Sequence, residues 1–286
     1  MVASDGVDSD SVRMEHRTHR TGVIAILNVT PDSYYDGGHH LTIDVLLDSA
    51  KKALNGGADI LEIGGESTGP ASMDVSVDEE LRRVLPALQA IRREMPAAWI
   101  SVDTTKAIVA KASLQEGARM INDVSAGRAD PEMFSVIAQS GCPYVLMYAK
   151  DPTPRTTKAS IQYTDVIATI RNFLMQRMEA AIVAGIDRSQ LILDPGLGHF
   201  VSSDPAYSFE ILRRLSELTD LGPILVSPSR KSFLAGPKHL PSADRLLATL
   251  EANVMAVHHG ASFIRTHDSK ETREALVSIT QKFSTR

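Results

Sequence analysis

The chain has 286 residues, a formal net charge of -5 and a hydrophobic content of 43%. This length suits one α/β barrel of about 250 residues, and the hydrophobic content is sufficient to fill its core. The sequence has no cluster of basic residues of the kind that binds nucleic acid, and no apolar run approaches the roughly 20 residues of a membrane helix. We therefore expect a protein that contacts neither nucleic acid nor membrane.

Residues 1–20 are polar and contain no apolar segment, so we expect a flexible tail and no signal peptide. The single cysteine, Cys142, cannot form an internal disulfide and precedes an expected buried strand. We interpret it as a small core residue in a cytoplasmic protein.

From residue 22 onward, short β-rich segments alternate with longer segments of helical periodicity. The expected strands are 23–28, 59–64, 99–102, 119–122, 144–147, 191–193, 224–227 and 262–266. The expected helices are 43–55, 77–94, 106–116, 131–140, 163–184, 206–218, 243–259 and 271–283. Eight βα units in an unbroken series predict a parallel sheet closed into one (β/α)8 barrel (TIM barrel) domain over residues 21–286.

An open doubly wound sheet is the competing fold. It would require a glycine-rich phosphate-binding turn after the first strand. The residues that follow Asn28 are Val-Thr-Pro-Asp-Ser, which do not form such a turn, so the sequence favours the barrel. The polar segment 149–160 follows the fifth expected strand, and we expect either an ordered lid or a mobile insertion on the carboxyl face of the barrel.

Polar residues stand at the carboxyl ends of most of the expected strands, where barrels of this type carry their active sites. Helix capping would explain one or two of them, but buried charges need partners or a ligand. The residues concerned are Asn28, Glu66, Thr68, Asp103, Asn122, Asp194, Lys231, Arg265 and His267.

Two kinds of chemistry are present in this set. The acceptors Asp103, Asn122 and Asp194 suit a flat heterocycle that presents adjacent N–H donors. Positive charge and donors suit an anion such as a phosphate, and they come from Lys231, Arg265 and His267. Asn28 would help to hold a Mg²⁺ ion that bridges phosphates, so a polar heterocycle with a diphosphate arm fits the whole set.

Seven segments resemble, in order, the signatures of the dihydropteroate synthase family, and together they cover residues 22–280. They include Asn-Val-Thr-Pro-Asp-Ser at 28–33, Gly-Gly-Glu-Ser-Thr at 64–68, Asp-Pro-Gly at 194–196, Ser-Arg-Lys-Ser at 229–232 and Arg-Thr-His-Asp at 265–268. The remaining matches are Ser-Val-Asp-Thr at 101–104 and Ile-Asn-Asp-Val-Ser at 121–125.

The resemblance implies a folate-biosynthesis transferase that condenses 6-hydroxymethyl-7,8-dihydropterin diphosphate with 4-aminobenzoate and releases pyrophosphate. Loops 29–40 and 65–76 would close over the site, and the family commonly forms homodimers through its last helices. The implied catalytic residues are Asp103, Asp194 and Lys231. The implied substrate-binding residues are Thr68, Asp103, Asn122, Met147, Asp194, Lys231, Arg265 and His267, with Asn28 as the Mg²⁺ ligand.

The chain departs from the family pattern at several positions around the expected 4-aminobenzoate subsite. Gly69 stands where the family has arginine, no lysine follows the Asp-Pro-Gly segment, and Tyr148 and Ala149 replace the usual His-Met. His199 and Phe200 follow Asp-Pro-Gly-Leu-Gly. A synthase with an altered arylamine pocket, a specialised paralogue with another nucleophile and a non-catalytic pterin-binding paralogue therefore stay open. Methyl transfer to a corrinoid is disfavoured, because it would leave the expected diphosphate subsite without a purpose.

Overall fold

The computed structural model describes residues 20–29, 43–70 and 72–284. Residues 1–19 of the expected tail at 1–20, and residues 30–40 of the expected lid at 29–40, lie outside these ranges. Eight parallel strands form one sheet in the order β6-β5-β4-β3-β2-β1-β8-β7. The strands are β1 (Gly22–Asn28), β2 (Ile60–Gly64), β3 (Ile100–Asp103), β4 (Met120–Asp123), β5 (Tyr144–Met147), β6 (Leu191–Asp194), β7 (Leu225–Val226) and β8 (Phe263–Thr266).

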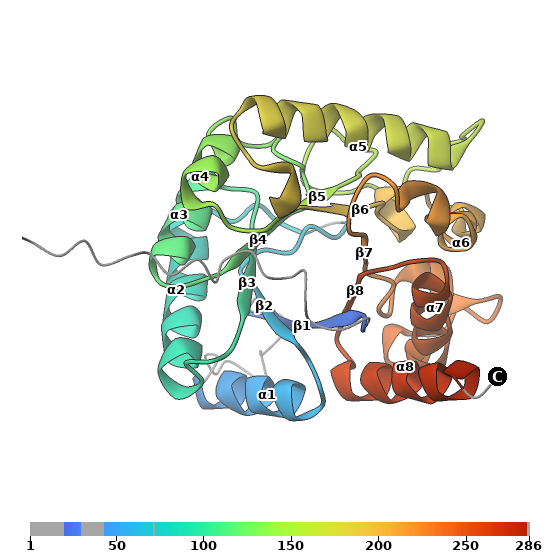
Figure 1. The fold of residues 1–286 in the computed structure, drawn as a ribbon, viewed down its shortest axis with the longest axis horizontal. Helices are drawn as coiled ribbons and strands as arrows, with labels where there is room; N and C mark the ends of the chain where they lie inside the picture. The colour runs from blue at the N-terminus through green and yellow to red at the C-terminus, as the bar shows by residue number, and fades with distance from the viewer. Residues whose placement is uncertain (1–19, 30–42, 71, 285–286) are drawn as a thin grey trace, which may run out of the picture.

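The sheet closes on itself between β6 and β7. Leu193 and Ile224 form a parallel bridge there, and the Leu193 N–H donates a 2.9 Å hydrogen bond to the carbonyl of Pro223. The helices surround the strands, as Figure 1 shows, which confirms the expected closed barrel. They are α1 (Ile43–Asn55), α2 (Val77–Glu94), α3 (Ala107–Gln115), α4 (Met133–Ser140), α5 (Val166–Val183), α6 (Pro205–Arg213), α7 (Leu246–His258) and α8 (Ser269–Ser284).

The expected helix over 206–218 is interrupted in the structure. Helix α6 ends at Arg213, Arg214 has φ -106° and ψ 15°, and the chain continues as a 3-10 turn over Leu215–Leu218. The change of direction buries the side chains of Leu215 and Leu218 completely. Apolar burial therefore overrides the uninterrupted helical propensity of this segment.

Towards the amino-terminal ends of the strands, the barrel interior is filled by an apolar plug. One residue from each of six strands contributes to it, and Trp99 and Phe263 pack against it. The six residues are Ile24, Ile60, Met120, Val145, Ile192 and Leu225. A second, larger apolar cluster fills the layer between strands and helices, and Cys142 is buried there as a free thiol, as expected.

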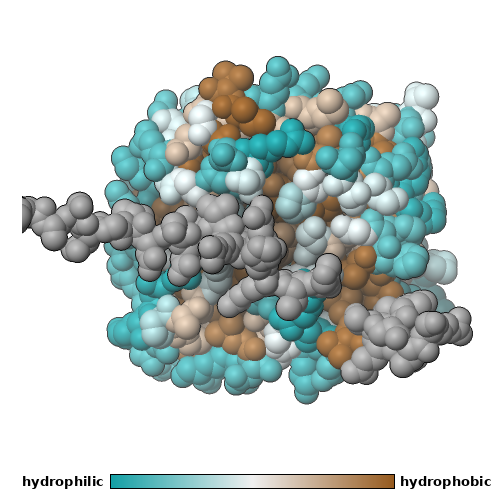
Figure 2. Space-filling view, in the orientation of Figure 1, coloured by the Kyte–Doolittle hydropathy of each residue, from teal (hydrophilic) through white to brown (hydrophobic). Residues whose placement is uncertain are grey.

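The outer surface is mostly hydrophilic on the face that Figure 2 shows, although apolar side chains gather over α5. Met175, Ile182 and Val183 of this helix are exposed. Within the described ranges, no helix has the length and apolar character needed to cross a membrane.

Candidate active site

A polar layer lies directly above the apolar plug because side chains of a β-strand alternate between its two faces. Two positions beyond the plug residues Ile60, Met120 and Ile192, the same inward-facing positions carry Glu62, Asn122 and Asp194. The same step leads from Phe263 to Arg265 and from Val145 to Met147. Because side chains alternate between the two faces of each strand, acids, an amide and an arginine lie at the carboxyl end of the barrel interior.

Arg265 joins two acids from other strands. Its Nε is ion-paired with Oε1 of Glu62, and its Nη2 donates a 2.8 Å hydrogen bond to Oδ2 of Asp103. Glu62 is 1% exposed and also accepts a 3.3 Å hydrogen bond from the Ser101 hydroxyl. Strands β2, β3 and β8 are therefore linked through one guanidinium across the barrel.

Burial raises the pKa of the Asp103 carboxyl to about 7. The positive charge of Arg265 opposes this shift, whereas the negative charge of Glu62 adds to it. Asp103 therefore carries a carboxyl group that titrates near neutral pH. Perturbed groups of this kind cluster at functional sites.

Asp194 and Lys231 form the second charged couple of the layer. Oδ1 of Asp194 accepts a 2.7 Å hydrogen bond from the Gly196 N–H. Burial raises the pKa of Asp194 to about 6 against the opposing effect of Lys231. Burial also lowers the pKa of Lys231 to about 8, while Asp194 opposes that shift. Gly196 has φ +67°, and a Cβ atom there would collide with the carbonyl oxygen of Tyr148, so the turn requires glycine.

Asn122 has a buried side-chain oxygen, Oδ1, without a hydrogen-bond partner. The residue is 3% exposed, and its Cα is the register partner of Asp103 in the neighbouring strand. An unsatisfied buried acceptor is costly, so the amide oxygen of Asn122 offers a place for a donor from a ligand. Met147 lies close by in a small buried cluster with Val124 and Ala149, against which Phe200 packs.

His267 lies at the carboxyl end of β8 and is held by Ser229. The Ser229 Oγ lies 3.0 Å from Nδ1 of His267 and accepts a 3.1 Å hydrogen bond from its backbone N–H. Burial, together with the positive charge of Arg265, lowers the pKa of His267 to about 4. This shift favours the neutral ring, although His267 is an exposed residue. The positive charge expected from the sequence stays a prediction for the state with an anion bound.

Asn28 ends β1 beside the charged layer. Its register partner is Gly64, and a Cβ atom built on Gly64 would lie 4.0 Å from Oδ1 of Asn28 and 3.6 Å from Cβ of Asp103. The amide oxygen of Asn28 and the carboxylate of Asp103 therefore flank the same small space. Thr68 lies further out, and its carbonyl accepts a 3.2 Å hydrogen bond from the Thr156 N–H.

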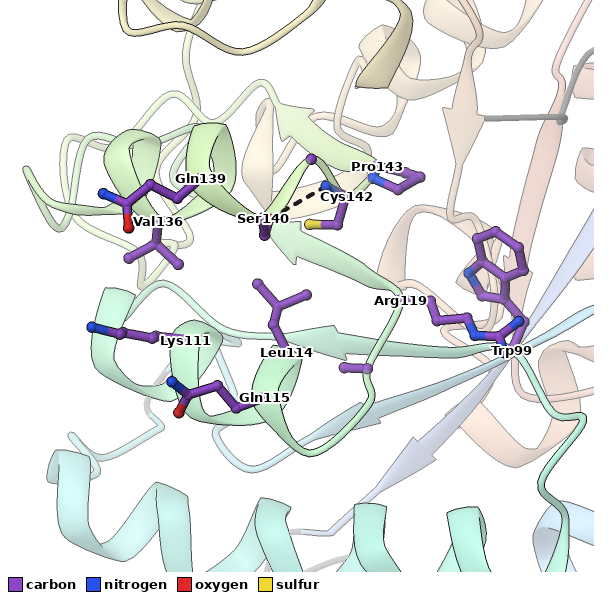
Figure 3. A pocket seen from close by; sticks show the side chains of 12 residues that line it. Trp99, Lys111, Leu114, Gln115, Arg119, Val136, Gln139, Ser140, Cys142 and Pro143 are labelled. Atoms are coloured by element: carbon purple, nitrogen blue, oxygen red, sulfur yellow. Dashed lines mark hydrogen bonds between the residues drawn. The ribbon is translucent and has the colours of Figure 1, made fainter. Parts of the chain in front are cut away.

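A cavity of about 650 Å³ opens at the other end of the barrel. It lies between α3 and α4, with Trp99, Arg119 and Pro143 before the first residues of β3, β4 and β5 (Figure 3). Its wall also includes Lys111 and Cys142. This is the amino-terminal face, where barrel enzymes do not carry their catalytic groups.

The sequence of the chain is similar to those of known proteins. The family of pterin binding enzymes matches residues 24–267 of the chain. Dihydropteroate synthase of Synechocystis sp. is 40% identical over 251 residues, which cover 87% of this chain and 86% of the relative. That of Escherichia coli is 38% identical over 255 residues, which cover 89% of each. The chain belongs to the dihydropteroate synthase family.

Solved structures of dihydropteroate synthases have the same fold. The enzyme of Xanthomonas albilineans with 4-aminobenzoic acid superposes with a TM-score of 0.86 at 37% identity and covers 94% of each chain. The same enzyme in complex with 7,8-dihydropteroate gives a TM-score of 0.82 at 36% identity, over 94% of this chain and 95% of that one. The agreement extends over nearly the whole chain.

Some features of this dihydropteroate synthase family member were missed by sequence reasoning. Glu62 was overlooked because it lies inside a strand, although an acid within the apolar run Ile-Leu-Glu-Ile was the available signal. The departure from the family pattern associates Tyr148 with the arylamine subsite. Its ring instead packs edge-on against Phe173 of α5, and its hydroxyl lies 3.1 Å from that of Tyr163. Tyr148 therefore belongs to the core outside the barrel.

Proposed function

We propose that this chain is a dihydropteroate synthase, which condenses 6-hydroxymethyl-7,8-dihydropterin diphosphate with 4-aminobenzoate and releases pyrophosphate. The observation that carries the proposal is the inward-facing polar layer at the carboxyl end of the barrel. It combines two titratable carboxyl groups with an unsatisfied amide oxygen and two partly buried cations, Lys231 and Arg265. The dihydropteroate synthases to which the chain is similar support the same reaction.

The pterin ring would lie against Asp103, Asn122 and Asp194. Its ring N–H and amino groups are donors, and these three side chains are acceptors at the carboxyl ends of β3, β4 and β6. Oδ1 of Asn122 would gain the partner that it lacks. Met147 would form an apolar wall, and Lys231 would lie beside Asp194 to fix the orientation of the ring.

The diphosphate would lie on the other side of the layer, towards Arg265, His267 and Asn28. Within the described ranges, no group of three or more His, Cys, Asp or Glu side chains could hold a metal ion. A single amide oxygen nevertheless fits Mg²⁺ that is bound chiefly by substrate phosphates and water. Asn28 would hold the ion, which would neutralise charge on the departing diphosphate.

The reaction begins when the bond between the pterin methylene carbon and the diphosphate oxygen breaks. Pyrophosphate leaves with the electron pair, and the pterin carries the positive charge. Asp103 and Asp194 would stabilise that charge, because fixed negative groups in a site of low dielectric act strongly on developing charge. The arylamine nitrogen then attacks the methylene carbon and loses a proton. Loop 65–76, with Thr68, would help to exclude water from the cation.

The arylamine subsite of this chain would differ from the common family pattern. Gly69 supplies no side chain, and His199 and Phe200 lie beside Ser232 and Lys231. A broader or shifted subsite would still accept a flat aromatic amine.

The test is incubation of the purified chain with the pterin diphosphate, Mg²⁺ and 4-aminobenzoate, with both pyrophosphate and dihydropteroate measured. The proposal predicts equal amounts of the two products. Tight pterin binding without turnover would instead favour a non-catalytic paralogue, and turnover only with another nucleophile would favour a specialised one.

The assembly would be a cytoplasmic homodimer formed through α7 and α8. These helices pack against each other, and their outer faces expose Leu247 and Val277, whose side chains are 70% and 42% exposed. Analytical ultracentrifugation should give twice the mass of one chain. A monomer at micromolar concentration would contradict this arrangement.

A further inference from the structure

The loop between β5 and α5 makes a set of contacts that the proposed chemistry does not use. Arg155 in this loop is ion-paired with Glu66 and Asp74 of loop 65–76, and its Nε donates a 3.0 Å hydrogen bond to the Ser72 carbonyl. The Glu66 side chain is 13% exposed, whereas that of Asp74 is 94% exposed. The ion pair with Glu66 therefore contributes more to holding the loop than the pair with Asp74, because exposed ion pairs contribute little to stability.

Thr156 makes the second set of contacts. It is 4% exposed although the loop around it is polar. Its N–H donates a 3.2 Å hydrogen bond to the Thr68 carbonyl, and its hydroxyl donates a 2.6 Å hydrogen bond to the His199 carbonyl. One buried residue thus joins loop 65–76 to the segment that follows Asp-Pro-Gly.

Hydrogen bonds within the loop hold residues 150–157 in one conformation, so we call this segment the spacer between loop 65–76 and segment 197–200. Oδ2 of Asp151 accepts hydrogen bonds from Nζ of Lys150 at 2.5 Å and from the Thr157 N–H at 2.9 Å. The Lys150 N–H donates a 2.8 Å hydrogen bond to the Phe200 carbonyl. The spacer is therefore attached to segment 197–200 at two points, Lys150 and Thr156.

Segment 197–200 is attached to the catalytic layer on its other side. Nε2 of His199 lies 3.1 Å from the Ser232 hydroxyl, and Nζ of Lys231 lies 5.1 Å from the centre of the Phe200 ring. Nζ of Lys231 also donates a 3.4 Å hydrogen bond to the Leu197 carbonyl. A displacement of this segment would therefore change the positions of Lys231 and Ser232.

We propose that Arg155 and Thr156 are positioning residues that set the width of the arylamine subsite by clamping loop 65–76 to segment 197–200. This inference rests on the proposed synthase function. Gly69 has no side chain. Glu66 is paired through one oxygen with Lys106 of the β3–α3 connection and through the other with Arg155, so Arg155 supplies the cation that ties loop 65–76 to the loop after β5. The clamp acts on the rim where the second substrate enters, while the pterin-facing carboxylates lie on separate strands.

Steady-state kinetics of Arg155→Ala and Thr156→Val test the clamp. We expect the KM for 4-aminobenzoate to rise about tenfold in each variant. Arg155→Ala removes the ion pair with Glu66, and Thr156→Val removes the hydrogen bond to the His199 carbonyl. The KM for the pterin diphosphate should stay within about twofold of its original value. Thr156→Ser retains the hydroxyl and should restore the lower KM.

Arg171→Ala is the matched control, because Arg171 forms an exposed ion pair with Asp220 on the outer helix α5. Its kinetics should equal those of the unaltered chain. Equal rises in both KM values, or no change in either, would overturn the proposal. If the unaltered chain itself forms no dihydropteroate, the proposed function fails, and hydrogen exchange then tests the clamp alone. Exchange at 66–74 and 197–200 should increase in Arg155→Ala, and unchanged exchange at both segments would overturn the clamp.

Discussion

Arg265 of β8 donates a 2.8 Å hydrogen bond to Oδ2 of Asp103 of β3, although β1 and β2 lie between these two strands in the sheet. Only a closed barrel brings these side chains together, because their strands face each other across its interior. The same guanidinium is ion-paired with Glu62. One cation between two acids makes the protonation of Asp103 sensitive to the charges of Arg265 and Glu62.

The pH dependence of kcat/KM for the pterin diphosphate should be bell-shaped. Asp194 and Asp103 have raised pKa values of about 6 and about 7, so their negative charge is lost as the pH falls through this range. Lys231 has a lowered pKa of about 8, so its positive charge is lost as the pH rises through that value. Activity should fall on both sides. A profile that is flat between pH 5 and 9 would refute the assignment.

Glu62→Gln should move the acid limb of that profile to lower pH. The negative charge of Glu62 raises the pKa of Asp103, so its removal lets Arg265 keep Asp103 ionised in more acidic solution. Urea unfolding should show a loss of roughly 1–3 kcal/mol, since a buried partner of Arg265 becomes neutral. An unshifted acid limb would show that Glu62 does not act on Asp103.

Asp194→Asn should lower kcat by about a hundredfold or more, because it removes a fixed negative charge from the developing cation. The amide oxygen can still accept the Gly196 N–H, so the melting temperature should change little. Asp187→Asn alters an exposed capping acid and serves as the control. Full activity of Asp194→Asn would remove this residue from the catalytic set.

Lys231→Ala should weaken binding of the pterin diphosphate by about tenfold or more, as measured by calorimetry. The lysine opposes the upward pKa shift of Asp194, so its loss also leaves that carboxylate less ionised near neutral pH. Lys111→Ala, in the cavity on the opposite face, is the comparison. Equal affinities of the two variants would contradict the assigned role.

Much of this architecture could be predicted from local pattern. The alternation of strands and helices predicts the closed barrel, and strand-end residues such as Asp103, Asn122 and Asp194 meet in one layer. Glu62 is not predicted by a pattern of polar strand ends, because it lies inside β2, two residues before the strand ends at Gly64. The protonation state of His267 could not be predicted from the sequence, because it depends on how far the fold desolvates the ring and on the neighbouring charge of Arg265.

Other features depend on contacts that no local pattern contains. Arg155 reaches Glu66 across 89 positions of sequence, and this pairing becomes visible only when the loops are placed in space. The end of α6 at Arg213 likewise reflects the burial of Leu215 and Leu218 rather than a breaker residue.

The most direct test is a crystal structure of the chain with the pterin diphosphate bound. The account predicts the ring within hydrogen-bond distance of Asp103, Asn122 and Asp194, with its phosphates towards Arg265 and His267. A ring bound in the cavity between α3 and α4, or bound at the barrel mouth without contact to these three acceptors, would contradict it.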